Sequence, residues 1–203
     1  MKYIIENTDR LDEEFMKRAV PYLSLQRLRS LDKMRVRQDR LNSAVVYLML
    51  RYALKKEYGI TDAPEFTFGE RGKPYLEKGQ PFFNLSHCRN ACACIVSDQE
   101  NGCDISDKRL ITSRTAGYFC SKEELDEING REDMNDLLLR AWTVKEFYSK
   151  LDGRGLLMDL RNIPENKLSA ISCYTGERYF AAFTGKSEEK PEIITAEDIF
   201  SVL

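Results

Sequence analysis

Long apolar runs, paired cysteine motifs and histidines are all scarce in this sequence. No stretch approaches the ~20 apolar residues that a membrane span requires. The first ten residues turn polar after a short apolar stretch, which is too brief for the core of a signal peptide. These absences predict a soluble protein that stays in the cytoplasm.

The cysteines form no Cys-x-x-Cys pair, and His87 is the only histidine. A zinc site would have to draw on scattered cysteines, so the sequence does not predict one. Cys92 and Cys94 alternate with small apolar residues, as in a buried strand. We expect reduced and mostly buried thiols at Cys88, Cys92, Cys94, Cys103, Cys120 and Cys173.

Charge is nearly balanced overall but uneven along the chain. The 203 residues are 42% hydrophobic and 32% charged with a net charge of −2, which is typical of a folded protein and argues against generic nucleic-acid binding. Residues 27–56 are strongly basic, which suits a small polyanion or an acidic partner protein, although a solvated helix face gives the same pattern. The basic residues there are Arg27, Arg29, Lys33, Arg35, Arg37, Arg40, Arg51, Lys55 and Lys56.

Hydrophobic periodicity predicts blocks of helices and strands. A strand at 2–7 precedes an amphipathic helix that ends near Pro21, a basic helix capped by Ser24, and a long buried helix at 39–58 that Gly59 ends. Residues 66–81 are rich in glycine, proline and charge, which predicts a loop or edge strand. The remaining predicted elements are strands at 82–86, 91–97 and 102–106, helices at 113–128 and 133–151, strands at 167–174 and 178–185, and a helix at 195–203.

This block order favours an α+β fold over alternating βαβ units. Residues 1–98 and 99–203 each contain helical segments and a short antiparallel meander. The sequence therefore predicts a pseudo-dimer of two similar α/β halves, each with helices packed on a short antiparallel sheet. Such a chain would be a monomer with its active site at the seam.

Two carboxylates are candidates for chemistry. Asp104 follows a glycine in a short strand whose alternation sends its two neighbours to the opposite face. Glu146 lies beside aromatic residues in a helical segment, where an ionised carboxylate needs a cation as its partner. Each has an ordinary alternative: a surface aspartate after a glycine, or an (i, i+4) helix pair between Glu146 and Lys150.

Five short motifs occur in a characteristic order: GKP at 72–74, FNLSH at 83–87, GCDI at 102–105, WTVKEFYSK at 142–150 and GRGL at 153–156. In this order and spacing they resemble the motif series of the 4′-phosphopantetheinyl transferase superfamily, and within it the Sfp-type branch. The resemblance extends more loosely to the basic residues at 27–51 and so covers most of the chain.

The resemblance implies a transferase of the holo-[acyl-carrier-protein] synthase type. Such an enzyme moves the 4′-phosphopantetheine arm of coenzyme A to a serine of an apo acyl or peptidyl carrier protein and releases adenosine 3′,5′-bisphosphate. It also implies a Mg²⁺ ion held by Asp104 and Glu146 with the pyrophosphate of coenzyme A, and oxygen ligands of this kind suit that ion. Neither a nucleic acid nor a membrane is an expected partner.

The resemblance assigns roles to other residues as well. Residues 1–98 would hold the adenosine and phosphate end of coenzyme A, and 99–203 would carry the metal and catalytic residues. Glu124 matches the family's general base, with Glu123 as the alternative; Lys145, Lys150 or both would reach the phosphates. Arg27 fits the 3′-phosphate better than Lys33. The full set of matched cofactor-binding positions is Arg27, Lys33, Arg71, Gly72, Lys73, Pro74, Ser86, His87, Asp104, Lys145 and Lys150.

Ser106 departs from the family pattern, which usually has a second acidic residue there. Asp107 points to the other face of the strand and is a poor substitute. We therefore expect a magnesium site of two protein carboxylates, completed by phosphate and water. The alternative is a catalytically weak coenzyme-A-binding or carrier-docking protein on the same scaffold. A generic magnesium-dependent phosphotransferase has no support, because the sequence contains no Gly-x-x-x-x-Gly-Lys-Ser/Thr loop.

Overall fold

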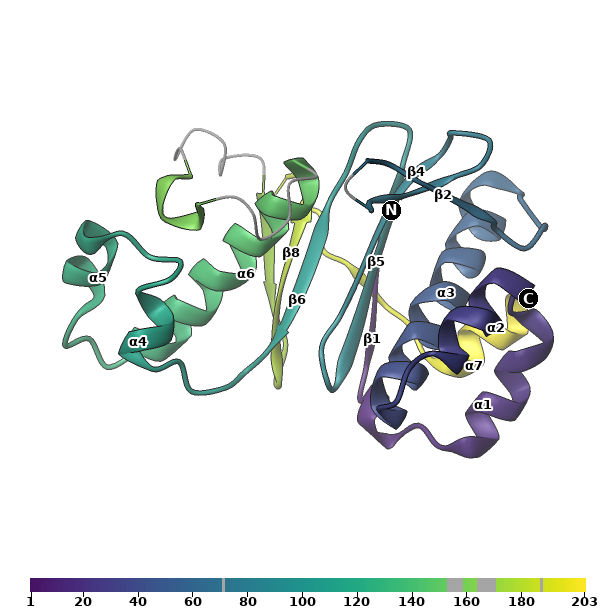
Figure 1. Cartoon of the computed structure of the whole chain (residues 1–203), viewed down its shortest axis with the longest axis horizontal. Helices are drawn as coiled ribbons and strands as arrows, with labels where there is room; N and C mark the ends of the chain where they lie inside the picture. Colours follow the sequence, from purple (N-terminus) through teal and green to yellow (C-terminus); the bar gives the residue numbers. More distant parts are fainter. Residues whose placement is uncertain (71, 153–158, 164–170, 187) are drawn as a thin grey trace.

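The structure is a computed structural model that describes residues 1–70, 72–152, 159–163, 171–186 and 188–203. Two halves lie side by side, and their sheets meet in the middle of the elongated molecule (Figure 1). One half holds the long helix α3 (Arg37–Tyr58) and a four-stranded sheet, and the other holds α6 (Met134–Asp152) and a three-stranded sheet. The predicted α+β class is confirmed.

The four-stranded sheet has the order β4-β5-β1-β9. The central strand β1 (Lys2–Glu6) pairs antiparallel with β5 (Ala91–Ser97), which pairs antiparallel with β4 (Phe82–His87). Strand alternation gives β5 two apolar faces: Cys92 and Cys94 belong to the core that contains α3, whereas Ala93 and Ile95 pack with residues of the second sheet. The sheet is therefore covered on both faces, which explains its continuous apolar sequence.

The helix α3 fills the core of the first half. Its residues are buried almost without interruption from Leu41 to Leu54, so it is buried on every side over that length. Gly59 ends it in the left-handed conformation with φ of 66°, which a residue with a side chain rarely adopts. The predicted helix at 39–58 and its glycine stop are confirmed.

Shorter elements surround α3. Helix α1 (Glu13–Ala19) begins where the Asp12 side chain accepts the backbone N–H groups of Glu14 and Phe15, so it is shorter than the predicted helix. Helix α2 (Leu25–Asp32) begins at the predicted cap Ser24. Within the predicted loop or edge strand at 66–81, β2 (Phe66–Phe68) and β3 (Pro74–Leu76) form a hairpin of their own. Short 3₁₀ helices lie at Thr8–Arg10, Val20–Tyr22 and Leu160–Asn162.

The second sheet has the antiparallel order β6-β8-β7, formed by β6 (Cys103–Asp107), β8 (Tyr179–Thr184) and β7 (Ile171–Thr175). Helix α6 packs on this sheet. A Cβ atom added at Gly102 would lie 3.1 Å from the Phe147 ring, so glycine permits this close approach. Residues 167–170 of the strand predicted at 167–174 lie outside the described residues, as does the motif at 153–156.

The single helix predicted at 113–128 is wrong. Helix α4 (Ser113–Ala116) ends at Gly117, and α5 (Lys122–Ile128) begins separately. The break has a local cause, because the side chain of Ser121 accepts the backbone N–H of Glu124 and the Glu124 side chain accepts that of Ser121. This capping box starts a new helix at a point where periodicity alone suggested continuity.

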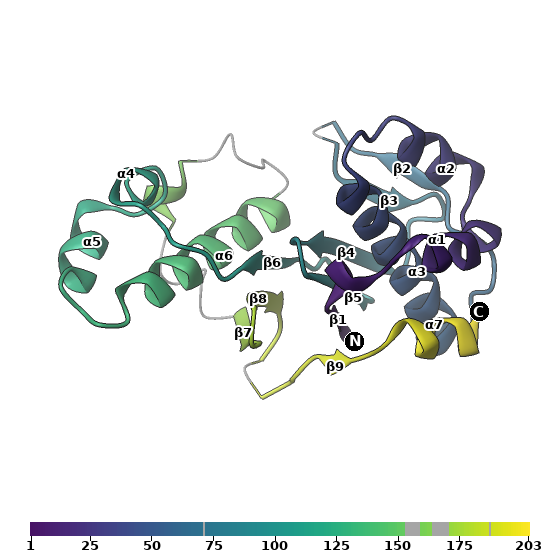
Figure 2. The same cartoon turned by 90° about the horizontal axis from the view of Figure 1, so that it is seen from below.

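The C-terminal segment returns to the first half. Strand β9 (Glu192–Ile193) pairs in parallel with β1, and α7 (Ala196–Val202) packs against α3, as Figure 2 shows. Arg18 of α1 also forms an ion pair with Glu197 of α7, at 2.6 Å. The last residues of the predicted 99–203 half therefore lie on the sheet and helix of the 1–98 half.

All six cysteines are free thiols, five of them buried and Cys173 partly exposed, as the sequence predicted. Within the described ranges, no helix has both the length and the apolar character needed to cross a membrane.

Candidate active site

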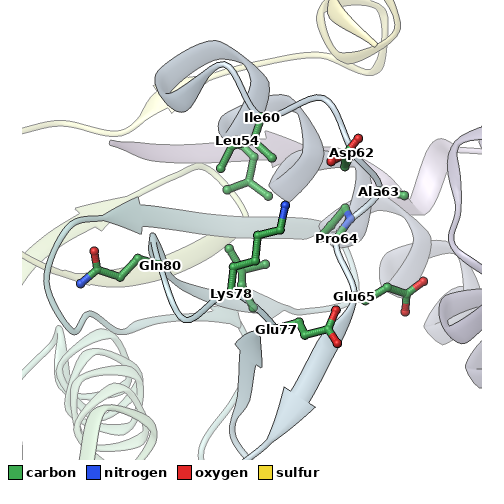
Figure 3. Close-up of a pocket in the computed structure, with 10 residues that line it drawn as sticks. Leu54, Ile60, Asp62, Ala63, Pro64, Glu65, Glu77, Lys78 and Gln80 are labelled. Carbon is green, nitrogen blue, oxygen red and sulfur yellow. The ribbon is translucent and has the colours of Figure 1, made fainter.

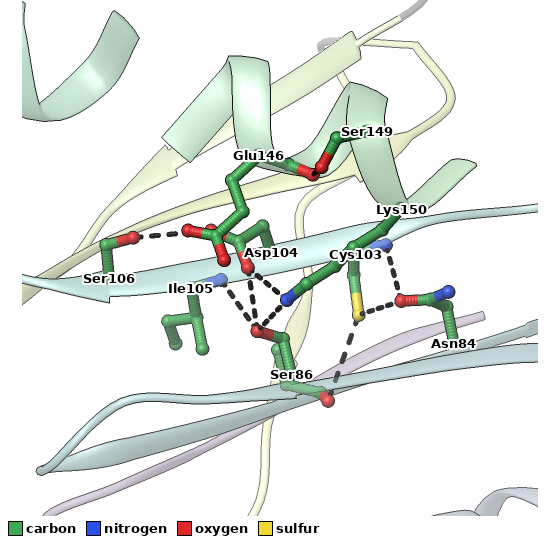
Figure 4. Close-up of polar contacts among 10 residues, drawn as sticks. Asn84, Ser86, Cys103, Asp104, Ile105, Ser106, Glu146, Ser149 and Lys150 are labelled. Atoms are coloured by element: carbon green, nitrogen blue, oxygen red, sulfur yellow. Dashed lines mark hydrogen bonds and ion pairs between the residues drawn. The ribbon is translucent and has the colours of Figure 1, made fainter. Parts of the chain in front are cut away.

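Three elements from the two halves converge at the seam. Ser86 comes from β4, Asp104 from β6 and Lys150 from α6 (Figure 4). The Ser86 hydroxyl donates to Oδ1 of Asp104 at 2.9 Å, and the Lys150 ammonium donates to the same hydroxyl at 2.9 Å. Lys150 also forms an ion pair with Asp104, whose side chain is 2% exposed. The buried carboxylate is thus held by a hydroxyl and a cation.

Ser86, Asp104 and Lys150 line a cavity of about 300 Å³ together with Glu146, and this is the carboxylate cavity. Burial, followed by the negative charge of Asp104, raises the pKa of Glu146 to about 7, although Lys150 and Arg109 act in the opposite direction. Lys150 behaves conversely: burial disfavours its charge, but Asp104 and Glu146 outweigh burial and hold the pKa of Lys150 above its ordinary value. The Lys150 ammonium therefore interacts electrostatically with both Asp104 and Glu146.

This donor set fits a hard divalent cation. Asp104 and Glu146 supply carboxylate oxygens, which Mg²⁺ prefers, and a second positive charge would relieve the repulsion that raises the pKa of Glu146. In the part of the chain that the structure describes, no group of three or more His, Cys, Asp or Glu residues is positioned to hold a metal. The protein itself supplies two carboxylate ligands, so water and ligand phosphate would have to complete the coordination.

Ser106 and Asp107 do not add a third carboxylate ligand. The Ser106 hydroxyl donates to Oδ2 of Asp104 at 3.3 Å, so it supports the carboxylate in place of a third acidic ligand. Asp107 accepts hydrogen bonds from the Arg89 backbone N–H at 2.9 Å and from the Asn90 side chain at 2.5 Å. Asp107 is thereby engaged with the turn between β4 and β5.

A second cavity of about 420 Å³ lies between α2, α3 and the β2–β3 hairpin. Arg27 is half-buried there: it donates to the Ser43 hydroxyl at 2.9 Å, and its guanidinium lies 5.1 Å from the centre of the Tyr47 ring and 5.5 Å from that of Phe66. Burial lowers the pKa of Arg27, and among the described residues no carboxylate forms an ion pair with it. A buried cation without a carboxylate partner favours an anionic ligand.

The two cavities share His87, which lines both of them. Partial desolvation, followed by the positive charge of Lys150, lowers the pKa of His87. Gly72 and Pro74 line the same cavity as Arg27. The predicted sites on the two halves are therefore adjacent, with the imidazole at their boundary.

Lys33 and Lys73, two of the predicted cofactor-binding residues, line neither cavity. Lys33 is exposed at the end of α2. The Lys73 ammonium lies over the ring of Tyr75 in its own hairpin, 5.7 Å from the ring centre. Arg71 lies outside the described residues.

Glu124 and Lys145 form a separate pair. The Lys145 ammonium is buried and donates to Oε2 of Glu124 at 2.6 Å and to the Phe119 carbonyl at 2.8 Å. The same Oε2 accepts the backbone N–H of Ser121 at 2.7 Å. Among the described residues the exposed Glu123 has no such cation, and hydrogen bonds from the backbone and from Ser121 lower its pKa. The lining of the carboxylate cavity includes neither Glu124 nor Lys145.

Sequence reasoning missed two groups of cavity residues. Arg109 lines the carboxylate cavity next to Glu146, and its only signal was a Lys-Arg pair directly after a predicted strand. Ser43 and Phe66 surround Arg27 but come from a helix and a hairpin without a motif. Their proximity depends on how α3 and the hairpin pack together.

Another cavity, shown in Figure 3, is less suited to a phosphorylated ligand. It lies beside the C-terminal end of α3, and its charged lining residues are Asp62, Glu65, Glu77 and Lys78. The excess of carboxylates would repel phosphate. The cavity with Asp104 and Glu146 and the cavity with Arg27 are therefore the better candidates.

Comparison with known proteins finds similar sequences. A sequence model described as the 4′-phosphopantetheinyl transferase superfamily matches residues 100–195. The chain is 23% identical over 154 residues to 4′-phosphopantetheinyl transferase Sfp of Bacillus subtilis, covering 74% of this chain and 69% of the relative. It is 46% identical over 119 residues to 4′-phosphopantetheinyl transferase AcpT of Salmonella typhimurium, covering 56% and 62%.

A third relative is the L-aminoadipate-semialdehyde dehydrogenase-phosphopantetheinyl transferase of Candida glabrata, with 30% identity over 147 residues, covering 67% of this chain and 57% of the relative. The matches to these three relatives thus span 57% to 69% of their lengths. The matched region includes both Asp104 and the α6 motif. By its motifs and by these matches, the chain is similar to members of the 4′-phosphopantetheinyl transferase superfamily, the Sfp type among them.

Proposed function

We propose that this protein transfers the 4′-phosphopantetheine arm of coenzyme A to a serine of an apo acyl or peptidyl carrier protein, in a Mg²⁺-dependent reaction of the holo-[acyl-carrier-protein] synthase type. The observation that carries the proposal is the cluster of Asp104, Glu146 and Lys150 at the seam, next to a cavity that holds a half-buried arginine. The arginine offers a cation to a phosphate at one end of a nucleotide diphosphate ester. The lysine and the two carboxylates offer a cation and metal ligands to its pyrophosphate.

Coenzyme A would bridge the two cavities. Arg27 takes the 3′-phosphate, because a half-buried guanidinium gains charge-assisted hydrogen bonds from a phosphate. The adenosine lies against Gly72 and Pro74, and the chain of the cofactor passes His87 to reach the other cavity. There the ammonium of Lys150 neutralises part of the pyrophosphate charge. Lys33, Arg71 and Lys73 remain predicted contributors to coenzyme A binding.

Asp104 and Glu146 would hold the magnesium ion. When bound, the ion supplies charge neutralisation for the bridging oxygen of the pyrophosphate, whose bond to phosphorus breaks in the transfer. The ion pair with Lys150 orients Asp104 before the ion arrives. Glu146 is the more adaptable ligand, since no described residue holds its carboxylate by a hydrogen bond, and burial followed by the charge of Asp104 raises its pKa.

Glu124 is the proposed general base, and Lys145 fixes its position. The carrier serine attacks phosphorus, its proton passes to the Glu124 carboxylate, and adenosine 3′,5′-bisphosphate leaves. What supports Glu124 over Glu123 is its ion pair with the buried Lys145, which restricts the carboxylate to one orientation. The oxygen Oε2 receives two donors, which leaves Oε1 available for a proton.

The two halves would act together in one monomer. A pseudo-dimer of similar halves accounts for a site whose adenosine side comes from 1–98 and whose metal side comes from 99–203. The basic surface at 27–56 would serve coenzyme A, an acidic carrier protein or both.

Intact-mass analysis tests the proposal. The protein is incubated with coenzyme A, Mg²⁺ and several apo carriers, with a carrier whose target serine is alanine and an EDTA sample as controls. We expect one apo carrier to gain the mass of one phosphopantetheine group in the Mg²⁺ sample alone. Coenzyme A binding without any mass gain would instead support the catalytically weak binding protein, and absence of both would refute the proposed function.

A further inference from the structure

The hydroxyl of Ser86 lies where the two halves of the molecule meet. Ser86 is 5% exposed. Its hydroxyl donates to Oδ1 of Asp104 at 2.9 Å and accepts from Nζ of Lys150 at 2.9 Å and from the backbone N–H of Ile105 at 3.3 Å. One oxygen on β4 thus contacts β6 twice and α6 once (Figure 4).

These three contacts use the whole bonding capacity of the hydroxyl. A serine offers one donor and two acceptor lone pairs, and here each is matched by a partner. Donating to a phosphate through this oxygen would mean breaking its bond to the buried Asp104 side chain, and accepting from adenosine would mean displacing Lys150 or the Ile105 N–H. The neighbouring residue differs: the His87 side chain is exposed and lines both cavities, so it can meet a cofactor without losing such a bond.

The burial of Asp104 makes the position of its partner Lys150 important. An ammonium loses rotamer freedom when it is held next to a carboxylate, and the serine oxygen gives it a second fixed acceptor. The backbone N–H of Ile105 fixes the serine oxygen in turn. The geometry of Lys150 relative to Asp104 is therefore set by a side chain from the opposite half.

We propose that Ser86 is a positioning residue that fixes Lys150 against Asp104 across the seam, and not a contact for the adenosine end of coenzyme A. The proposal rests on the transfer function proposed above for its kinetic consequences, but its structural content does not depend on that function. It separates two adjacent residues of one motif into different roles: Ser86 orders the charged cluster, and His87 faces the cofactor.

The kinetic test compares Ser86→Ala, Ser86→Thr and Ser106→Ala. Loss of a hydrogen bond to a charged group in Ser86→Ala should lower kcat about tenfold, while the Kd for coenzyme A changes less than about twofold. Thr keeps the hydroxyl and suits a strand, so Ser86→Thr should recover kcat to within about threefold of the parent. Ser106→Ala, the matched control, removes one longer bond to Asp104 and none to Lys150, so its loss should be smaller.

Two further measurements judge the proposed role. In a Lys150→Met background, Ser86→Ala should lower kcat less than about twofold, because the group it positions is gone. An undiminished loss in that background would overturn the proposal. A Ser86→Ala variant that binds coenzyme A more than about tenfold more weakly, yet binds 3′-dephospho-coenzyme A normally, would also overturn it and assign Ser86 to the 3′-phosphate.

Urea unfolding tests the contact between Ser86 and Lys150 without an activity measurement. The effects of Ser86→Ala and Lys150→Met on the free energy of unfolding should be clearly non-additive in the double variant, since both act on one contact. Additive effects would refute the contact itself. If the parent protein transfers nothing to any carrier, the transfer function fails, whereas the unfolding cycle still decides whether Ser86 holds Lys150.

Discussion

The strongest physical prediction concerns Glu146 in the metal-free protein. Burial and the adjacent Asp104 raise the pKa of this carboxyl from 4.5 to about 7. Between these values the folded protein keeps a proton that the unfolded chain has already released. Because the folded state binds more protons there, the free energy of unfolding falls as pH rises from about 4.5 through about 7. Above that range the free energy of unfolding is lowered by the full cost of ionising Glu146 in the folded protein.

The size of the effect follows from the shift. Each pKa unit corresponds to about 1.4 kcal/mol, so a shift from 4.5 to about 7 costs up to about 3 kcal/mol. Glu146→Gln keeps the shape of the side chain and removes the titration. The difference in unfolding free energy between variant and parent should therefore grow in favour of the variant by up to about 3 kcal/mol between about pH 4 and about pH 8.

Urea denaturation in EDTA at closely spaced pH values measures this difference. Glu127→Gln, on the exposed side of α5, is the matched control, and its difference from the parent should stay nearly constant with pH. A flat difference for Glu146→Gln, or one that grows in favour of the parent as pH rises, would refute the reasoning about charge repulsion at the seam.

Three other substitutions test neighbouring parts of the account. Gly102→Ala places a Cβ 3.1 Å from the Phe147 ring and should lower the free energy of unfolding by about 1–3 kcal/mol in urea titrations; an unchanged value would contradict the close packing of α6. Ser106→Glu adds an oxygen ligand beside Asp104, and calorimetry with coenzyme A present should show about tenfold tighter Mg²⁺ binding, whereas weaker binding would argue against the site. Arg27→Met should weaken coenzyme A about tenfold or more while changing the Kd of 3′-dephospho-coenzyme A less than about threefold; equal losses would remove Arg27 from the 3′-phosphate.

Much of the framework could be predicted from local sequence. Helix α3 was evident from its apolar spacing and Gly59, because both signals act within one element. Strand alternation likewise placed Asp104 on the face opposite Cys103, since the two-residue period of a strand is local. The order of the motifs indicated the family, because each motif is a short contiguous stretch of the chain.

The charged contacts across the seam were less predictable. The (i, i+4) spacing suggested a helix pair between Glu146 and Lys150, but Lys150 reaches Asp104 on another element, because a buried aspartate needs a cation more than a half-buried glutamate does. Ser86 was assigned to adenosine because its motif matches that role, and only the packing of β4 beside β6 reveals its three bonds. Such pairings depend on the relative placement of two halves, which no sequence period encodes.

The same limit explains the error at 113–128. Apolar spacing continued through Gly117, but the capping box at Ser121 outweighed it and began a new helix. That break places Glu124 at the first turn of α5, where it meets Lys145 from α6. A local capping signal thus decided the position of the proposed base.

The most direct measurement is the intact mass of an apo carrier after reaction with coenzyme A and Mg²⁺, for the parent protein and for Asp104→Ala side by side. The account predicts that the parent adds one phosphopantetheine group, and that Asp104→Ala, although folded by circular dichroism, adds none in the same time. Equal mass gain by both proteins would contradict a reaction that depends on the carboxylates at the seam.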